Sequence, residues 1–543
     1  MSNGIYEVKT PVNEPILAYA PGAREKKELK SRLAELKSKE YEIPLIIGGT
    51  EIRTGKTGKC IIPHDKKHVL AVYHKAGEPE IRKAIEAALA AKWQWENMPW
   101  EHRAAIFLKA AELLAGPWRS TLNAATMLGQ SKTAFQAEID AACELIDFFR
   151  FNAYFMRELY KDQPGSTSAY WDRLEYRPLE GFVFAVTPFN FTSIAGNLPS
   201  APAMMGNTVL WKPASTAVYS GYFLMKLFEE AGLPPGVINF IPGTGAQIGE
   251  IVLNHTELAG IHFTGSTKVF QQMWKTVGNN IGKYRSYPRI VGETGGKDFI
   301  FAHPTADIRA LATAMIRGAF EYQGQKCSAA SRAFVPRSIW NKLLKILDSE
   351  IRTIRMGDTE DFTNFLGAVI DQNSFDNLKS CIETARKSKD AEVVIGGKCD
   401  SSKGFFIEPT VILAKDPKFK TMVEEIFGPV LTIYVYADKD YEKTLKLCDA
   451  GSPYGLTGAV FARDRYALVQ MENALRHAAG NFYLNDKPTG AVVGQQPFGG
   501  SRASGTNDKA GSKLNLIRWT SPRAIKELFD PPKAYGYPFM AEK

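Results

Sequence analysis

The sequence predicts an α/β fold, in which parallel sheets are covered by helices and divided between two domains. The chain has 543 residues, more than one compact domain usually holds, and its 45% hydrophobic and 23% charged residues are typical of a globular protein. Through the middle of the chain, short apolar segments alternate with segments of helical periodicity. This alternation begins again after residue 293, which indicates a second unit of the same class.

The first series of elements begins with amphipathic helices and continues as strand–helix units. Apolar residues at helical spacing predict helices over residues 79–93, 101–115 and 136–152. Strands are expected at residues 182–186, 209–211, 237–241 and 259–263, with helices at 220–231 and 245–254. Such βαβ units form parallel sheets with right-handed crossovers.

The second series has the same character. Strands are expected at residues 298–301, 332–335, 393–396, 406–412, 429–436 and 458–461, with helices at 306–320 and 339–354. We therefore expect a first domain from residues 1–155 and 178–295 and a second from residues 296–505. The alternation of strands and helices does not extend to residues 156–177 and 506–543. We expect these segments to contact a neighbouring subunit.

Composition argues against several classes of protein. The net charge of +9 is spread along the chain, and its basic clusters have no interleaved aromatic residues, so we expect no nucleic-acid partner. The six cysteines form no CxxC pair, which predicts a reducing compartment and no disulfide framework. The eight histidines form no metal-binding motif, so we expect no metal.

Membrane insertion and export are also not expected. Residues 181–211 carry no charge, but prolines and asparagines interrupt them, so a buried strand, loop and helix fits better than a membrane span. The first residues resemble neither a signal peptide nor a transit sequence. We expect a cytoplasmic protein, or one of the mitochondrial matrix if a transit peptide has been removed.

Cys327 and Glu293 are the first candidates for chemistry. Cys327 follows a turn that contains Gly324 and lies beside Lys326, and Glu293 lies 34 positions earlier. A thiol must lose its proton before it attacks a carbonyl carbon, and a carboxylate can accept a proton from the thiol or from an attacking water. A lone cysteine is more often inert core, so this pairing is a hypothesis at this point.

Several predicted strands end in residues that can bind phosphate or ribose. The strand at 259–263 runs into Gly265 and Ser266, and Gly245 and Gly249 follow the strand at 237–241. Each segment also fits a plain turn, and the second departs from the GxGxxG pattern by one position. Lys212 ends a third strand, where it can hold a ribose or simply extend into solvent.

Asn190 lies just past the strand at 182–186. Its side-chain amide can donate a hydrogen bond to a developing oxyanion, although an asparagine in a turn often bonds its own backbone instead.

Together, seven motifs resemble the aldehyde dehydrogenase superfamily. In order they are residues 187–190 (TPFN), 211–213 (WKP), 263–266 (FTGS), 293–297 (ETGGK), 324–327 (GQKC), 425–429 (EIFGP) and 497–500 (PFGG). The resemblance extends from about residue 79 to about residue 522. Residues 136–152, 189–192, 480–486 and 503–509 are similar to the Δ1-pyrroline-5-carboxylate (L-glutamate γ-semialdehyde) dehydrogenases within it.

The resemblance implies a Rossmann-type NAD-binding domain, an α/β catalytic domain and a small oligomerisation excursion. It implies that Cys327 is the nucleophile, that Asn190 and the Cys327 backbone N–H stabilise the oxyanion, and that Glu293 activates the water for hydrolysis of the thioester. The implied NAD-binding residues are Thr187, Phe189, Lys212, Ser215, Gly245, Gly249, Thr264, Gly265, Ser266, Glu425 and Phe427. The implied substrate-binding residues are Phe191, Ser328, Gly490, Ala491 and Phe498.

Two positions depart from the superfamily pattern. Many members carry glutamate where this chain has Ser215, so repulsion of a 2′-phosphate is lost and the preference between NAD and NADP stays open. Phe270 replaces the second glycine of the phosphate turn, as it does in the semialdehyde enzymes.

The expected function is therefore NAD-dependent oxidation of L-glutamate γ-semialdehyde to L-glutamate, the second step of proline breakdown. The alternatives are another aldehyde dehydrogenase, including one that transfers the acyl group to coenzyme A, and a non-catalytic binding protein on this fold. Glu293 argues against coenzyme A, because such an enzyme gains nothing from a base that activates water. The expected partners are a small-molecule substrate, further copies of the chain in a homodimer or larger assembly, and a separate proline dehydrogenase; a membrane is not expected.

Overall fold

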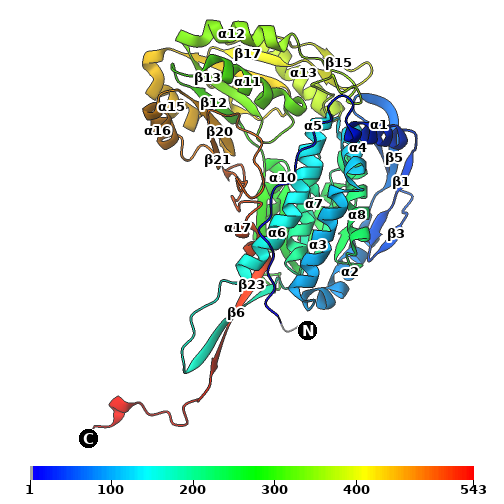
Figure 1. Ribbon diagram of the computed structural model, residues 1–543, viewed down its shortest axis with the longest axis vertical. Helices are drawn as coiled ribbons and strands as arrows, with labels where there is room; N and C mark the ends of the chain where they lie inside the picture. Colours follow the sequence, from blue (N-terminus) through cyan, green and yellow to red (C-terminus); the bar gives the residue numbers. More distant parts are fainter. Residues whose placement is uncertain (1–3, 543) are drawn as a thin grey trace.

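Two seven-stranded sheets organise the chain, one in each half of the view in Figure 1. The computed structural model describes residues 4–542. In the first sheet the five strands from β11 to β9 are parallel, and β2 and β3 extend it antiparallel. Its order is β11 (Arg289–Glu293), β10 (Leu258–Thr264), β7 (Phe182–Val186), β8 (Thr208–Lys212), β9 (Ile238–Phe240), β2 (Leu45–Ile47) and β3 (Thr50–Ile52).

Helices cover both faces of this sheet. On one face, apolar residues of α2 (Glu78–Glu96), α9 (Gly245–Leu253) and α10 (Thr267–Asn279) pack with Phe182, Phe184 and Leu210. On the other, α3 (Trp100–Ala115), α4 (Arg119–Gln130), α6 (Glu144–Tyr160), α7 (Thr192–Met204) and α8 (Val218–Ala231) pack with Val183 and Val209. The predicted parallel, helix-covered sheet is confirmed.

The uncharged segment 181–211 forms β7, α7 and β8, so it lies inside this domain as a buried strand, helix and strand. Within residues 4–542, no helix combines the length and the apolar character needed to cross a membrane.

The second sheet is built in the same way. Its order is β14 (Ala391–Ile395), β17 (Thr410–Ala414), β18 (Val430–Tyr436), β13 (Ala330–Pro336), β12 (Asp298–Ala302), β20 (Thr457–Phe461) and β21 (Asn481–Leu484), with only β14 antiparallel. α11 (Ile308–Phe320) and α12 (Arg337–Ile351) cover one face, and α15 (Tyr441–Ala450) and α16 (Arg465–Ala474) cover the other.

Two predicted elements differ from the structure. The strand expected at 406–412 is interrupted: β16 (Phe406–Ile407) pairs with β15 (Cys399–Asp400), and β17 starts only at Thr410. Pro409 lies between them and has no N–H to donate to a sheet, so the pairing cannot continue through it. The helix expected at 136–152 contains a π-helical turn (Glu138–Cys143) between α5 (Ala134–Ala137) and α6.

A two-stranded antiparallel arm projects from the first domain. β6 (Tyr170–Pro178) pairs with β23 (Thr520–Leu528), and the chain continues past the arm to its C-terminus (Figure 1). Residues that lead into each strand of the arm pack in the first domain's core, among them Met156 and Leu159 before β6 and Trp519 before β23.

The first residues of the chain form elements that the sequence did not predict. The helix α1 (Arg24–Lys37) and the sheet of β1 (Tyr41–Ile43), β5 (Asp65–His74) and β4 (Thr57–Ile62) pack onto the first domain. Before α1, an extended segment runs along α6 (Figure 1).

Candidate active site

Two cavities meet at Cys327. The first, of about 850 Å³, lies at the carboxyl ends of β7, β8 and β10, where ligands of open α/β sheets bind. The second, of about 710 Å³, is lined by residues of the π turn, the start of α6 and the loop 487–498. Cys327 lines both cavities, so its thiol can face a molecule in either.

A turn in the left-handed region of backbone space precedes Cys327. Tyr322, Gln323 and Gly324 have φ values of 51°, 54° and 63°. Such a conformation costs about 1–3 kcal/mol for each non-glycine residue, so surrounding contacts must hold it. The Gln323 side chain supplies such contacts, because its Nε2 donates to two backbone carbonyls, at 3.0 and 2.7 Å. At Gly324, a Cβ would lie 2.3 Å from the Gly428 carbonyl oxygen.

The electrostatic surroundings of Cys327 favour the neutral thiol. Burial raises the pKa of the Cys327 thiol well above its usual value, and the carboxyl groups of Asp298, Glu425 and Glu293 raise it further. The residue's own backbone N–H lowers the pKa. Formation of the nucleophilic thiolate therefore requires transfer of the proton to an acceptor.

Asn190 is buried beside the same turn. It lies between β7 and α7, and its Nδ2 donates to the Gln325 carbonyl oxygen at 3.0 Å. The carbonyl belongs to the residue two positions before Cys327. The amide of Asn190 is therefore a hydrogen-bond donor placed at the segment that carries the thiol.

Glu293 ends β11, and its carboxylate lies among glycines. The Gly500 N–H donates to its Oε2 at 3.0 Å, and a Cβ added to Gly499 or Gly505 would come within 3.0 Å of a carboxylate oxygen. Burial raises the pKa of Glu293 well above its usual value, and the Gly500 N–H and the Lys509 charge oppose this. Glu293 itself lines neither cavity, whereas the next residue, Thr294, lines the first.

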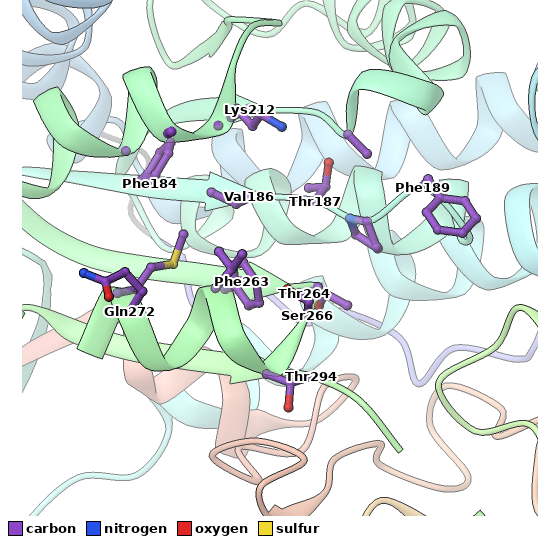
Figure 2. A pocket seen from close by; sticks show the side chains of 18 of the residues that line it. Phe184, Val186, Thr187, Phe189, Lys212, Phe263, Thr264, Ser266, Gln272 and Thr294 are labelled. Carbon is purple, nitrogen blue, oxygen red and sulfur yellow. The ribbon is translucent and has the colours of Figure 1, made fainter. Parts of the chain in front are cut away.

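The first cavity gathers ten of the eleven residues that the resemblance implies for NAD. Two helices, α9 and α10, begin at its edge after β9 and β10, and helix N-termini attract anions. Figure 2 shows Lys212 on one side of the cavity and Phe263, Thr264 and Ser266 on the other. Those ten residues are Thr187, Phe189, Lys212, Gly245, Gly249, Thr264, Gly265, Ser266, Glu425 and Phe427.

Charged groups in this cavity have shifted pKa values. Burial lowers the pKa of Lys212 to about 8. Burial raises the pKa of Glu425 to about 7, against the Gly296 N–H that donates to its Oε1 at 2.9 Å. Shifts of this size are common at functional sites.

Ser215, the eleventh residue, is not part of this lining. It begins a short 3₁₀ turn (Ser215–Ala217) and is exposed, and the preceding residue, Ala214, lines the cavity.

The second cavity gathers all five residues that the resemblance implies for the substrate: Phe191, Ser328, Gly490, Ala491 and Phe498. The Ser328 and Thr489 hydroxyls lie 2.7 Å apart. Gly490 has a φ of 99°, which a glycine adopts without strain. Neither the Gly490 nor the Ala491 N–H donates a hydrogen bond to another residue between 4 and 542.

Sequence reasoning missed the charged residues that the π turn places in this cavity. π turns insert one extra residue into a helix and are frequent at functional sites. Asp140 lies in the turn, its Oδ2 accepting from Lys132 at 2.6 Å and pairing with Lys326 at 3.5 Å. Glu144 follows the turn, and burial raises its pKa to about 8. The signal in the sequence was that Asp140 and Glu144 lie four residues apart within the apolar pattern of the helix predicted at residues 136–152.

Within residues 4–542, histidine, cysteine, aspartate and glutamate side chains nowhere form a group of three or more that could hold a metal ion.

Comparison with known proteins gives consistent matches. The sequence model of the aldehyde dehydrogenase family matches residues 51–525. The Δ1-pyrroline-5-carboxylate dehydrogenase named as mitochondrial from Dictyostelium discoideum is 55% identical over 98% of this chain and 96% of its own length. The one from Agaricus bisporus is 53% identical over 98% of each. A crystal structure of the Mycobacterium tuberculosis enzyme bound with NAD has 52% identity and a TM-score of 0.96, covering 99% of this chain and all of that one.

Proposed function

Because the chain belongs to the aldehyde dehydrogenase family, we propose that it oxidises L-glutamate γ-semialdehyde to L-glutamate with NAD. The semialdehyde is the open form of Δ1-pyrroline-5-carboxylate, on which the named relatives act. The observation that carries the proposal is the position of Cys327 between a cavity suited to a dinucleotide and a second cavity with charged walls.

The residues of the first cavity fit NAD. The N-termini of α9 and α10 suit the pyrophosphate, and Gly245 and Gly265 allow its close approach. Lys212 would donate to ribose hydroxyls near the adenine, and Glu425 would accept from those near the nicotinamide. When bound, NAD supplies the acceptor for the hydride.

Cys327 begins the reaction. The thiol gives its proton to solvent water and its sulfur attacks the aldehyde carbon, so an S–C bond forms, the C=O π bond breaks and the carbonyl oxygen becomes an oxyanion. Asn190 and Cys327 line the same cavity, and the Asn190 amide and the Cys327 backbone N–H would donate to that oxyanion. Each such donor is worth about 2.7–4 kcal/mol of barrier in a site closed to water.

Glu293 completes the cycle. After oxidation the acyl group is held on Cys327 as a thioester, and the Glu293 carboxylate takes a proton from a water molecule that attacks the thioester carbon. The C–S bond breaks, the thiolate is released, and the acyl group leaves as a carboxylic acid. Glu293 performs this step only in its ionised form.

The second cavity suits the amino-acid end of the substrate. The Ser328 hydroxyl and the Gly490 and Ala491 N–H groups would bind its carboxylate, while the Phe191 and Phe498 rings would enclose the aliphatic chain. Lys326 and Lys487 and the Asp140 carboxylate line the same cavity. Groups of both signs fit a zwitterion better than an aliphatic aldehyde.

Each domain and the projecting arm have a separate proposed role. We assign NAD binding to residues 1–155 and 178–295, catalysis to 296–505, and contact with a second copy of the chain to 156–177 and 506–543. Support comes from the projecting arm, whose exposed Trp171, Leu528 and Phe529 are apolar. Sedimentation velocity of the full chain should give a dimer or larger species; a monomer at micromolar concentration would contradict the assignment.

A cytoplasmic or matrix location and an association with a separate proline dehydrogenase stay predictions.

The direct test of the activity follows NADH absorbance with Δ1-pyrroline-5-carboxylate, propanal and hexanal as alternative substrates. We expect the highest kcat/KM with the semialdehyde, because only this substrate has a carboxylate for the second cavity. A higher kcat/KM with propanal or hexanal would contradict the substrate assignment. Parallel assays with NAD and NADP measure the coenzyme preference left open by Ser215.

A further inference from the structure

A short N-terminal segment, residues 13–19, forms one wall of the second cavity; we call it the strap. Asn13, Glu14 and Ile16 line that cavity beside the loop 489–496. The strap runs along α6 (Figure 1) and lies before residue 51, where the match to the aldehyde dehydrogenase family begins. It therefore lies outside the part of the chain that the family model matches.

Asn13 joins three parts of the cavity wall. Its Nδ2 donates to Asp147 Oδ2 of α6 and to the Val493 carbonyl oxygen, each at 2.8 Å. Its Oδ1 accepts from Gln495 Nε2 at 2.9 Å. One side chain thus connects the strap to α6 and to the loop 489–496, using both amide hydrogens and the oxygen.

The strap is itself firmly held. The Glu14 N–H donates to Asp147 Oδ1 at 2.8 Å, and the Glu14 carboxylate pairs with Arg119 at 2.6 Å and with Arg150 at 2.7 Å. Further along, the Leu17 N–H donates to Glu138 Oε1 at 2.8 Å. Because these bonds involve buried or part-buried partners, the strap is a fixed support rather than a fraying terminus.

The loop that Asn13 holds carries the proposed carboxylate donors. Gly490 and Ala491 lie three and two positions before Val493, whose carbonyl accepts from Asn13 and whose side chain is buried in the first domain's core. Gln495, two positions after Val493, is exposed and donates to Asn13. Asn13 therefore fixes the loop close to the backbone N–H groups that would meet the substrate.

We propose that Asn13 is a positioning residue for substrate specificity: it sets loop 489–496 so that the Gly490 and Ala491 N–H groups align with the substrate's carboxylate. This inference rests on the proposed function of the second cavity. Asn13 lies outside the first cavity and forms no hydrogen bond with Cys327, Glu293 or Asn190, so it acts on binding of the substrate's carboxylate and not on the chemical steps.

The test compares Asn13→Ala with wild type on two aldehydes. With the semialdehyde we expect kcat/KM to fall about 10- to 100-fold, mostly through a higher KM, because a displacement of about 1 Å has effects of this order. With propanal, which has no carboxylate, kcat/KM should stay within about twofold, as should the KM for NAD. Inhibition by the product, L-glutamate, should weaken in parallel with the semialdehyde effect.

Two further variants keep the test decisive. Asn97→Ala removes an exposed asparagine amide that caps α2 and should change neither aldehyde's kinetics. Asn13→Ser keeps a smaller hydrogen-bonding group and should give an intermediate loss; it replaces the alanine variant if that variant does not fold.

Equal losses with both aldehydes would overturn the inference, since that result indicates a general structural role; unchanged kinetics would overturn it as well. A failure of the proposed function is seen separately, as a wild-type enzyme that does not prefer the semialdehyde to propanal.

Discussion

Replacing Glu293 by glutamine should separate the two halves of the reaction. The amide is nearly isosteric with the carboxylate, and its oxygen can keep the 3.0 Å hydrogen bond from the Gly500 N–H. Its size also suits the space beside Gly499 and Gly505, where an added Cβ would come to 3.0 Å from a Glu293 carboxylate oxygen. Burial raises the pKa of Glu293, so removing the charge relieves desolvation, and the variant should fold as well as wild type.

The lost function is activation of water. A positioned general base contributes about 10²- to 10⁴-fold to a rate, which corresponds to about 2.7–5.4 kcal/mol of barrier. We therefore expect kcat of Glu293→Gln to fall by this factor, while attack by Cys327 and hydride transfer stay fast.

Stopped-flow absorbance of NADH measures both steps. The variant should give a burst of about one NADH per active site, followed by slow turnover, and mass spectrometry of the quenched protein should find the acyl group on Cys327. If the variant gave no burst of NADH, the assignment of Glu293 to water activation would be wrong, because Glu293 would then be the base that activates the thiol. An unchanged kcat would place the base for water elsewhere.

Three other predictions follow from the same geometry. Asn190→Ala removes an oxyanion donor, and kcat should fall about 10²- to 10³-fold with every aldehyde; a loss confined to one aldehyde would contradict that role. Gly324→Ala places a Cβ 2.3 Å from the Gly428 carbonyl oxygen, in a residue whose φ is 63°. The substitution should lower the free energy of unfolding, measured in urea, by more than about 1 kcal/mol. Wild-type stability of the variant would show that surrounding contacts do not fix the backbone of this turn. In the wild-type enzyme kcat should rise with pH as Glu293 ionises. The midpoint of this rise should lie well above 4.5, because burial raises the pKa of Glu293. If kcat of Glu293→Gln rose with pH in the same way, the rise would belong to another group.

Much of the fold was predictable because its signals are local. A buried parallel strand needs a short apolar run, and the strand ends predicted at residues 186, 211 and 263 lie within one residue of the observed ends at 186, 212 and 264. The carboxyl ends of neighbouring parallel strands meet at one edge of a sheet, so the grouping of Thr187, Lys212 and Thr264 around one cavity was predictable as well.

Other features depend on contacts that no local pattern encodes. The hydrogen bonds of the π turn at Glu138–Cys143 span five residues instead of the four of an α-helix. Buried partners such as Arg119 and Tyr19 hold its Glu138 in place. The strap has no periodicity, and its bond from Asn13 to Val493 joins residues 480 positions apart. Ser215 was assigned by resemblance alone; it starts a 3₁₀ turn and does not line the cavity, whereas Ala214 does.

The central claim is that Cys327, at the meeting point of two cavities, is the nucleophile. The most direct measurement is the rate of NADH formation by Cys327→Ala with Δ1-pyrroline-5-carboxylate, alongside a fluorescence titration of NAD binding. We predict no NADH formation above the uncatalysed rate, with NAD affinity within about threefold of wild type, because the loss of one thiol leaves the first cavity's other walls in place. Retained dehydrogenase activity in this variant would contradict the covalent mechanism and the assignment of the site.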